Sequence, residues 1–174
     1  MRAATALLTM EEFLELPDLP AGKRELLRGE LIDLPPAKFR HDLIADRLNK
    51  QLNAAVVAAG ISGEAFHEMG YQLSPSHWLQ PDVSITHPDQ PREDYLQGSP
   101  LLAVEIVSPS NTAEEIDIKI EDYLTFGARE VWVVYPERRH LWVYQPGISG
   151  RLYSESFDSA LLNGQRINLP ALFA

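Results

Sequence analysis

One short segment constrains the fold of this chain more than any other. Residues 101–107 form an almost continuous apolar run that contains a single charged residue, Glu105. An apolar run of this kind predicts a β-strand that is covered on both faces. The Glu105 carboxylate would then lie in a low-dielectric interior, where an unpaired charge is costly. We therefore expect Glu105 to be matched by a metal ion, a cationic side chain or a proton.

A second carboxylate and a lysine flank this strand in the sequence. Asp82 begins another short strand, predicted over residues 82–86, and a helix predicted over 111–126 follows the Glu105 strand. At about 100° per residue, Lys119 falls inside the buried arc of that helix. Its ammonium can either extend to solvent along the aliphatic stem or pair with the two carboxylates. The buried arc is set by Ile116, Ile120, Tyr123 and Leu124, whereas Glu114, Glu121, Asp122 and Thr125 are predicted to point the other way.

Composition narrows the class of protein and the kind of metal. With 174 residues, 45% of them hydrophobic, the chain is expected to form a single domain over residues 1–174. The absence of cysteine excludes disulfides and thiolate metal sites, so a bound metal would be a hard cation such as Mg²⁺. Neither a bilayer-spanning apolar run nor the order of a signal peptide is present, and a cytoplasmic protein with no membrane partner is expected.

The charge of the chain argues against a general nucleic-acid binder. The formal net charge is −10, and phosphate contacts require clustered Lys and Arg. Between residues 61 and 110, Arg92 is the one basic residue against seven acidic residues. An acidic middle segment suits divalent-metal chemistry, but it is equally typical of a solvated protein surface.

Local patterns predict the elements near the N-terminus. Thr9 and Glu12 form a capping box for a short helix. Residues 24–34 are predicted to form a hairpin that turns at Arg28 and Gly29. A long amphipathic helix is predicted over 40–59, with Gly60 as its left-handed cap. Its polar side carries Arg40, Arg47 and Lys50, either as a phosphate-facing strip or as a solvated face.

The rest of the chain reads mainly as strands, which sets the fold class. The pattern predicts a mixed α/β or α+β fold, a mixed β-sheet with the long helix and the Lys119 helix on one or both faces. Residues 75–80 and 87–100 are interpreted as connections without strands. Besides the two carboxylate strands, the predicted strands cover residues 64–67, 69–74, 130–135 and 140–144, with weaker candidates at 151–156 and 166–169.

Taken together, these motifs resemble the PD-(D/E)xK nuclease superfamily, and more narrowly the small Uma-two-type restriction endonucleases. The resemblance covers nearly the whole chain. Its most specific part is the run from Val104 to Asn111, and a Pro-Asp pair alone is a weak signal. The motifs that carry the resemblance are Glu25–Glu30, His41, Pro81–Ser84, Val104–Asn111, Lys119 with Tyr123, and Glu130–Trp132.

The resemblance implies a restriction-endonuclease-like core and an endonuclease that hydrolyses DNA with Mg²⁺ or Mn²⁺. Asp82 and Glu105 would be the metal ligands, with help from the backbone carbonyl of Ile106. The superfamily places its lysine two residues after the acid, where this chain has Val107. Lys119, supplied from the following helix, would replace it as the catalytic lysine.

Further implications concern accessory residues and assembly. Glu30 and His41 are candidate accessory ligands or phosphate contacts, although Glu30 can also be a surface acid of the turn and His41 a residue that satisfies local polar groups. Enzymes that cut both strands commonly act as homodimers, so a homodimer is expected. Candidate interface residues are Trp78, Leu79, Trp142 and Tyr144.

Two other classes of function remain open. A catalytically inactive relative that acts as a binding or assembly module would suit the acidic charge and Val107, and would tolerate Asp82→Ala. A metal-dependent hydrolase of a small acidic substrate would not need a basic track for DNA. The histidines at 67, 77 and 87 are too irregularly spaced to predict a zinc site.

Overall fold

The predicted Glu105 strand lies near the middle of a six-stranded sheet. The structure is a computed structural model, and it describes residues 7–174. The order of the strands is β11-β10-β9-β8-β6-β3; β8 and β9 run parallel, and the other neighbours are antiparallel. The bounds are β3 Ala65–His67, β6 Val83–Ile85, β8 Leu102–Ile106, β9 Glu130–Tyr135, β10 His140–Gln145 and β11 Ile148–Tyr153.

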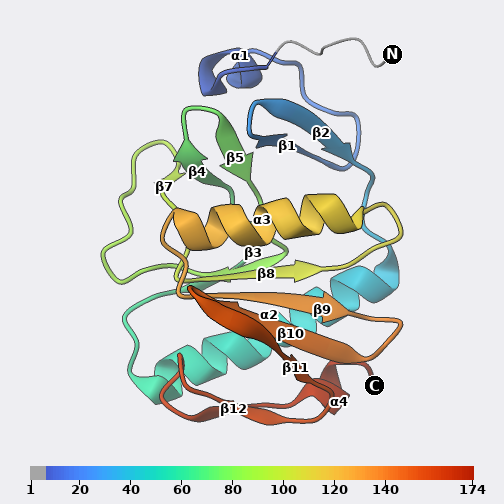
Figure 1. The fold of residues 1–174 in the computed structure, drawn as a ribbon, viewed down its shortest axis with the longest axis vertical. Coiled ribbons are helices and arrows are strands. Elements are labelled where there is room, and N and C mark those ends of the chain that lie inside the picture. The colour runs from blue at the N-terminus through green and yellow to red at the C-terminus, as the bar shows by residue number, and fades with distance from the viewer. Residues whose placement is uncertain (1–6) are drawn as a thin grey trace.

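Helices cover both faces of this sheet (Figure 1). The long helix α2 (Phe39–Ala59) packs on one face, where its buried Leu48 and Leu52 join Val104 of β8 and Trp132 of β9 in one hydrophobic cluster. Helix α3 (Ala113–Thr125) connects the parallel strands β8 and β9 and packs on the other face. Because successive strand residues alternate between faces, β8 directs Glu105 toward the α3 side.

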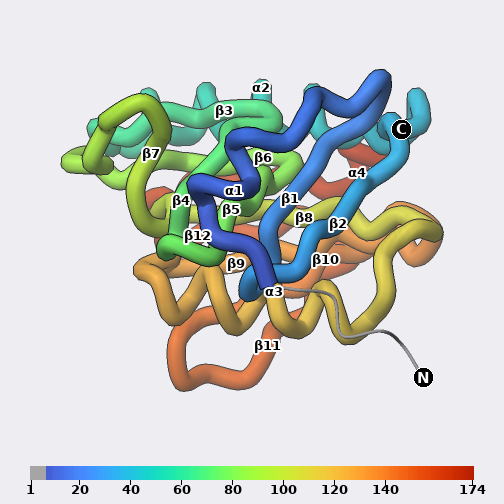
Figure 2. The backbone as a smooth tube through the Cα atoms, turned by 90° about the horizontal axis from the view of Figure 1, so that it is seen from above, coloured from blue at the N-terminus to red at the C-terminus, as the bar shows by residue number. Residues whose placement is uncertain are grey.

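A second, five-stranded sheet packs against α3. Its order is β2-β1-β5-β4-β7, and its apolar residues share a second hydrophobic cluster with α3 and the six-stranded sheet. Viewed from above, the β1–β2 and β4–β5 hairpins lie side by side on the near side of the molecule (Figure 2). The bounds are β1 Lys23–Leu27, β2 Glu30–Leu34, β4 Tyr71–Ser74, β5 His77–Leu79 and β7 Leu96–Gln97.

Four short elements complete the fold. Helix α1 (Met10–Leu14) begins with the predicted capping box, in which Thr9 accepts from the amide of Glu12 and the Glu12 carboxylate accepts in return. Strands β12 (Phe157–Ser159) and β13 (Gln165–Ile167) pair with each other, and α4 (Leu169–Leu172) follows them. Their buried apolar side chains close the α2 side of the core.

The predicted mixed α/β class is confirmed, and the strands divide between two main sheets. The hairpin at Arg28-Gly29, the α2 helix with its Gly60 cap at φ +66°, and the capped α3 helix are all present. Two predicted connections are wrong in detail, because residues 75–80 contain β5 and residues 87–100 contain β7. β5 forms a tight hairpin with β4 and also pairs with β1, and β7 pairs with β4. Strands of three and two residues are too short to show a clear alternation of polar and apolar side chains.

The prediction that Asp122 points away from the core is wrong. Asp122 is buried, because the second sheet covers that flank of α3. Arg28, in the β1–β2 turn, donates to both Asp122 oxygens at 2.7 to 3.2 Å, and His77 Nε2 lies 3.3 Å from Asp122 Oδ2. This polar contact ties both hairpins of the second sheet to α3.

Among residues 7–174, no helix is both long enough and apolar enough to cross a membrane.

Packing on α2 gives a direct stability test. Leu48 is fully buried between α2 and the six-stranded sheet, whereas Val57 on the same helix is 82% exposed. Leu48→Ala should lower the free energy of unfolding by about 3 kcal/mol, from lost burial and the cavity it leaves. Val57→Ala, the matched control, should change it by less than about 0.5 kcal/mol. Urea denaturation measures both, and equal effects would contradict this packing.

Candidate active site

A cavity of about 740 Å³ opens at the place where the two sheets and α2 meet. The open end of the β1–β2 hairpin, the start of α2 and the loop after β8 form its walls. Both predicted carboxylates, Asp82 and Glu105, line it, together with Lys23 and His41. The cavity therefore gathers ionisable side chains from several separate segments of the chain.

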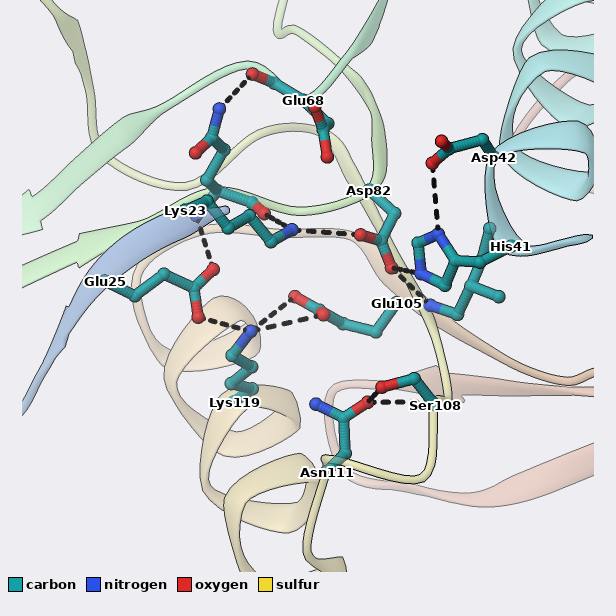
Figure 3. Close-up of polar contacts among 12 residues, drawn as sticks. Lys23, Glu25, His41, Asp42, Glu68, Asp82, Glu105, Ser108, Asn111 and Lys119 are labelled. Atoms are coloured by element: carbon teal, nitrogen blue, oxygen red, sulfur yellow. Dashed lines mark hydrogen bonds and ion pairs between the residues drawn. The ribbon is translucent and has the colours of Figure 1, made fainter. Parts of the chain in front are cut away.

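Asp82 precedes β6 and receives contacts from three directions (Figure 3). Its Oδ1 accepts from Lys23 Nζ at 2.9 Å, and its Oδ2 accepts from the Ile106 amide at 2.7 Å and lies 3.2 Å from His41 Nε2. Burial alone would raise the pKa of Asp82, but Lys23, His41 and the Ile106 amide outweigh it and hold that pKa well below its usual range. Asp82 is therefore an ionised carboxylate at the cavity wall.

Glu105 is held from the α3 side. Lys119 Nζ lies 3.2 and 3.3 Å from its two carboxylate oxygens, and the Tyr123 hydroxyl donates to Oε1 at 2.9 Å. Burial raises the pKa of Glu105 to about 7, with Asp82 and Glu25 adding to the rise and Lys119 opposing it. The carboxyl of Glu105 thus titrates near neutral pH while that of Asp82 stays ionised.

Lys119 is shared between two carboxylates beneath the cavity wall. Its Nζ lies 2.7 Å from Glu25 Oε2, and Glu25 Oε1 accepts from the Gln80 amide at 3.0 Å. Burial by itself would lower the pKa of Lys119, but Glu105 and Glu25 raise it well above its usual range. Lys119 is 3% exposed and, unlike Glu105, does not line the cavity. Its ammonium is therefore a fixed charge behind Glu105.

Lys23, at the start of β1, is a cavity residue that the sequence analysis missed. Its Nζ donates to Asp82 and to the Gln80 carbonyl, each at 2.8 to 2.9 Å. A signal was present in the alternation of β1, because Lys23, Glu25 and Leu27 share one strand face. Leu27 packs in the cluster with α3, so the two charged residues face the same interior.

Residues 10–174 match the model of the Uma2 family, which is described as "Putative restriction endonuclease". The chain belongs to the Uma2 family. Its fold is similar to the crystal structure of a putative nuclease belonging to DUF820 from Anabaena variabilis, with a TM-score of 0.81 and 23% identity over 95% of this chain and 97% of that one. None of the curated proteins matches this sequence.

Membership of the Uma2 family supports nuclease activity in general. In this Uma2 chain, Asp82 and Glu105 line the same cavity, and Lys119 contacts Glu105 from behind. His41 also lines this cavity, as a wall residue whose pKa Asp82 raises against the opposing effect of burial. What each residue contributes to a reaction stays a prediction.

Glu30 is not brought to the cavity. It pairs with Leu27 at the closed end of the hairpin, whereas Lys23 pairs with Leu34 at the open end that forms the cavity wall. Four residues of strand separate the two ends, roughly 13 Å at the usual rise per residue. Glu25, one of the residues that carry the family resemblance, supplies the carboxylate from this hairpin instead.

The cavity offers oxygen donors, which hard cations prefer. Two buried carboxylates, Asp82 and Glu105, line the cavity, and Mg²⁺ commonly binds one or two carboxylates while retaining waters. Within residues 7–174, no group of three or more His, Asp or Glu side chains is arranged to hold an ion. The residues therefore fit a magnesium ion that keeps much of its hydration, and do not fit a fully protein-coordinated ion.

The shifted Glu105 group predicts a pH-dependent stability. Its pKa is about 7 in the folded protein and 4.5 as the ordinary value, so folding retains the proton between these limits. The contribution to stability is full below about pH 4.5 and is lost as the pH rises through 7. Glu105→Gln cannot titrate. The unfolding free energy of the wild type should therefore fall by on the order of 2 kcal/mol relative to the variant between pH 5 and 8.

Urea denaturation at several pH values measures this difference. Glu64→Gln, at an exposed carboxylate, is the control. Parallel stability curves for the wild type and Glu105→Gln would contradict a titration of Glu105 near neutral pH.

Proposed function

We propose that this protein is a metal-dependent endonuclease that hydrolyses phosphodiester bonds of DNA. One observation carries the proposal: Asp82 and Glu105, from the adjacent segments at β6 and β8, line a single cavity and are each paired with a lysine ammonium. Paired acids with neighbouring cations suit a reaction at a charged phosphate. The membership of the Uma2 family supports the same class of reaction.

Asp82 and Glu105 are the proposed ligands of Mg²⁺ or Mn²⁺, and the backbone carbonyl of Ile106 is the proposed third oxygen. A bound ion of this kind supplies a Lewis acid and a water that deprotonates readily. Asp82 is ionised in the described state, and Glu105 becomes so above about pH 7. The two carboxylates can therefore both bind a cation at neutral to mildly alkaline pH.

Lys119 is the proposed functional lysine from α3, in place of the Val107 position. In the described conformation its ammonium contacts Glu105 and Glu25, so its first effect is to orient Glu105 and favour the ionised form. Its ammonium also offsets negative charge close to the cavity, which stabilises an anionic transition state. A direct contact between Lys119 and the attacking water requires the Glu105 side chain to move aside.

Contacts with DNA are proposed for the rim of the cavity. Lys38 and Arg40 lie on the rim, although Arg40 is paired with Glu137 in the described state. The strip that the sequence suggested does not extend further, because Arg47 binds backbone carbonyls of the C-terminal segment and Lys50 pairs with Asp46. With a net charge of −10, binding to DNA should be weak and sensitive to salt. A homodimer remains part of the proposal.

Substitution at Asp82 tests the proposal. Asp82→Asn keeps the size of the side chain and removes the charge that a metal would need. It should weaken Mg²⁺ or Mn²⁺ binding in calorimetry and slow plasmid nicking at low salt, each by on the order of 10²-fold or more. Asp89→Asn, at an exposed carboxylate outside the cavity lining, is the matched control and should leave both unchanged.

Other results would select the remaining classes. Metal binding without nicking by the wild type would favour a hydrolase of a small acidic substrate. A wild type that binds no metal would contradict the enzyme proposal and favour a binding or assembly module. The binding or assembly module is favoured by one observation, that Asp82 and Glu105 are each already paired with a lysine.

A further inference from the structure

The cluster formed by Asp82, Glu105 and their ion-pair partners contains two lysines, and they are not equivalent. Lys119 is 3% exposed and sits behind Glu105, whereas the Lys23 side chain is 18% exposed and lines the cavity. Within residues 7–174, Lys23 Nζ has two acceptors, Asp82 and the Gln80 carbonyl, and an ammonium has three donors. Lys23 is thus the cluster lysine with a donor still available on the cavity side.

The backbone of Lys23 is fixed at the cavity wall. Lys23 pairs with Leu34 at the end of the β1–β2 ladder. The preceding Gly22 has φ +88°, and a Cβ there would lie 2.1 Å from the Leu34 carbonyl oxygen, so the chain enters β1 through a turn that only glycine fits. A change of partner at Lys23 must therefore come from its side chain, which has four rotatable bonds.

The two lysines also differ in the free energy needed to move each ammonium away from its carboxylate partners. Displacing Lys119 would remove the ion-pair partner of two buried carboxylates, Glu25 and Glu105, which is strongly unfavourable. Displacing Lys23 leaves Asp82 with the Ile106 amide and with His41. Oδ2 of the Asp82 carboxylate keeps its partners in that case, and Oδ1 becomes available to a metal ion. Lys23 is therefore the cation of the cluster that can move.

Lys23 is paired with Asp82, the carboxylate that the proposed function assigns to a metal. Its ammonium lies 2.9 Å from Asp82 Oδ1, at the distance of a close ion pair. A divalent cation bound to Asp82 would repel an ammonium at that distance. The metal ion and the Lys23 ammonium therefore compete for the Asp82 carboxylate, and the cation that is displaced needs another anion nearby.

We propose that Lys23 acts as a latch. Its ammonium binds Asp82 in the absence of a metal, a metal ion displaces it, and it then contacts the phosphate of the substrate. This inference rests on the proposed function and adds to it a second lysine with a distinct task. Before loading, Lys23 neutralises Asp82 and keeps the cavity stable without an ion. After loading, its ammonium is close to the place where a bound phosphate diester would carry negative charge.

The test separates metal affinity from cleavage. Lys23→Met keeps the aliphatic stem and removes the competitor, so Mg²⁺ affinity measured by calorimetry without DNA should rise about tenfold. Single-turnover cleavage at saturating Mg²⁺ should fall by about 10²-fold, because the contact with phosphate is lost. Lys50→Met, at an exposed lysine of α2, is the control for charge removal and should change neither quantity.

The predicted rise in Mg²⁺ affinity and fall in cleavage rate distinguish a latch from a structural role. A residue that only supports the fold would lose metal affinity and cleavage together, and that result would overturn the inference. A second variant, Lys23→Arg, keeps a cation that competes with the metal. It should bind Mg²⁺ no more tightly than the wild type does, and it should retain more cleavage than Lys23→Met. Circular dichroism checks that each variant is folded.

Failure of the inference is distinguishable from failure of the proposed function. A wild type that binds Mg²⁺ and nicks DNA, with Lys23→Met unchanged in affinity and rate, overturns the latch and leaves the endonuclease in place. A wild type that neither binds the metal nor nicks DNA overturns both. Tighter metal binding with unchanged cleavage would also contradict the contact with phosphate.

Discussion

The arrangement of this protein depends on one buried ammonium, that of Lys119, shared between Glu25 and Glu105. These three buried groups must meet, because an ammonium or a carboxylate left here without a partner would cost several kcal/mol. Glu105 comes from the six-stranded sheet, Lys119 from α3 and Glu25 from the second sheet. Their pairing therefore holds three layers in a single register.

A second polar contact strengthens the same seam, the boundary between α3 and the second sheet. Asp122, one turn further along α3 at the i+3 position, binds Arg28 and faces His77, which belong to the two hairpins of the second sheet. Charged residues on α3 thus add to the apolar packing of Ile116, Ile120 and Tyr123 against the two sheets. Polar contacts of this kind are directional, so they specify where the second sheet lies on the helix more closely than apolar packing does. The cavity forms at one end of this seam.

The seam also explains why the two lysines differ. Lys119 is enclosed between layers and serves as a fixed charge, whereas Lys23 stands at the open end of the hairpin, at the wall of the cavity. Asp82 and Glu105 line the same cavity, and two carboxylates that ionise close together repel each other. In this Uma2 protein two ammonium groups offset that repulsion, one from behind Glu105 and one from the cavity side of Asp82.

Much of the structure was determined by the sequence itself, because the signals are local. The apolar run of β8 predicted a covered strand with a carboxylate that needs a partner, helical periodicity placed Lys119 on the buried side, and caps and turn residues set the ends of α2, α3 and the first hairpin. Only the tertiary structure decided that Lys23 and Glu25 join Asp82 and Glu105, that Glu30 does not, and that Asp122 is buried. These outcomes depend on how the hairpins dock across α3. The periodicity of a helix or strand indicates which face a residue occupies, but not which residue nearly a hundred positions away it will contact.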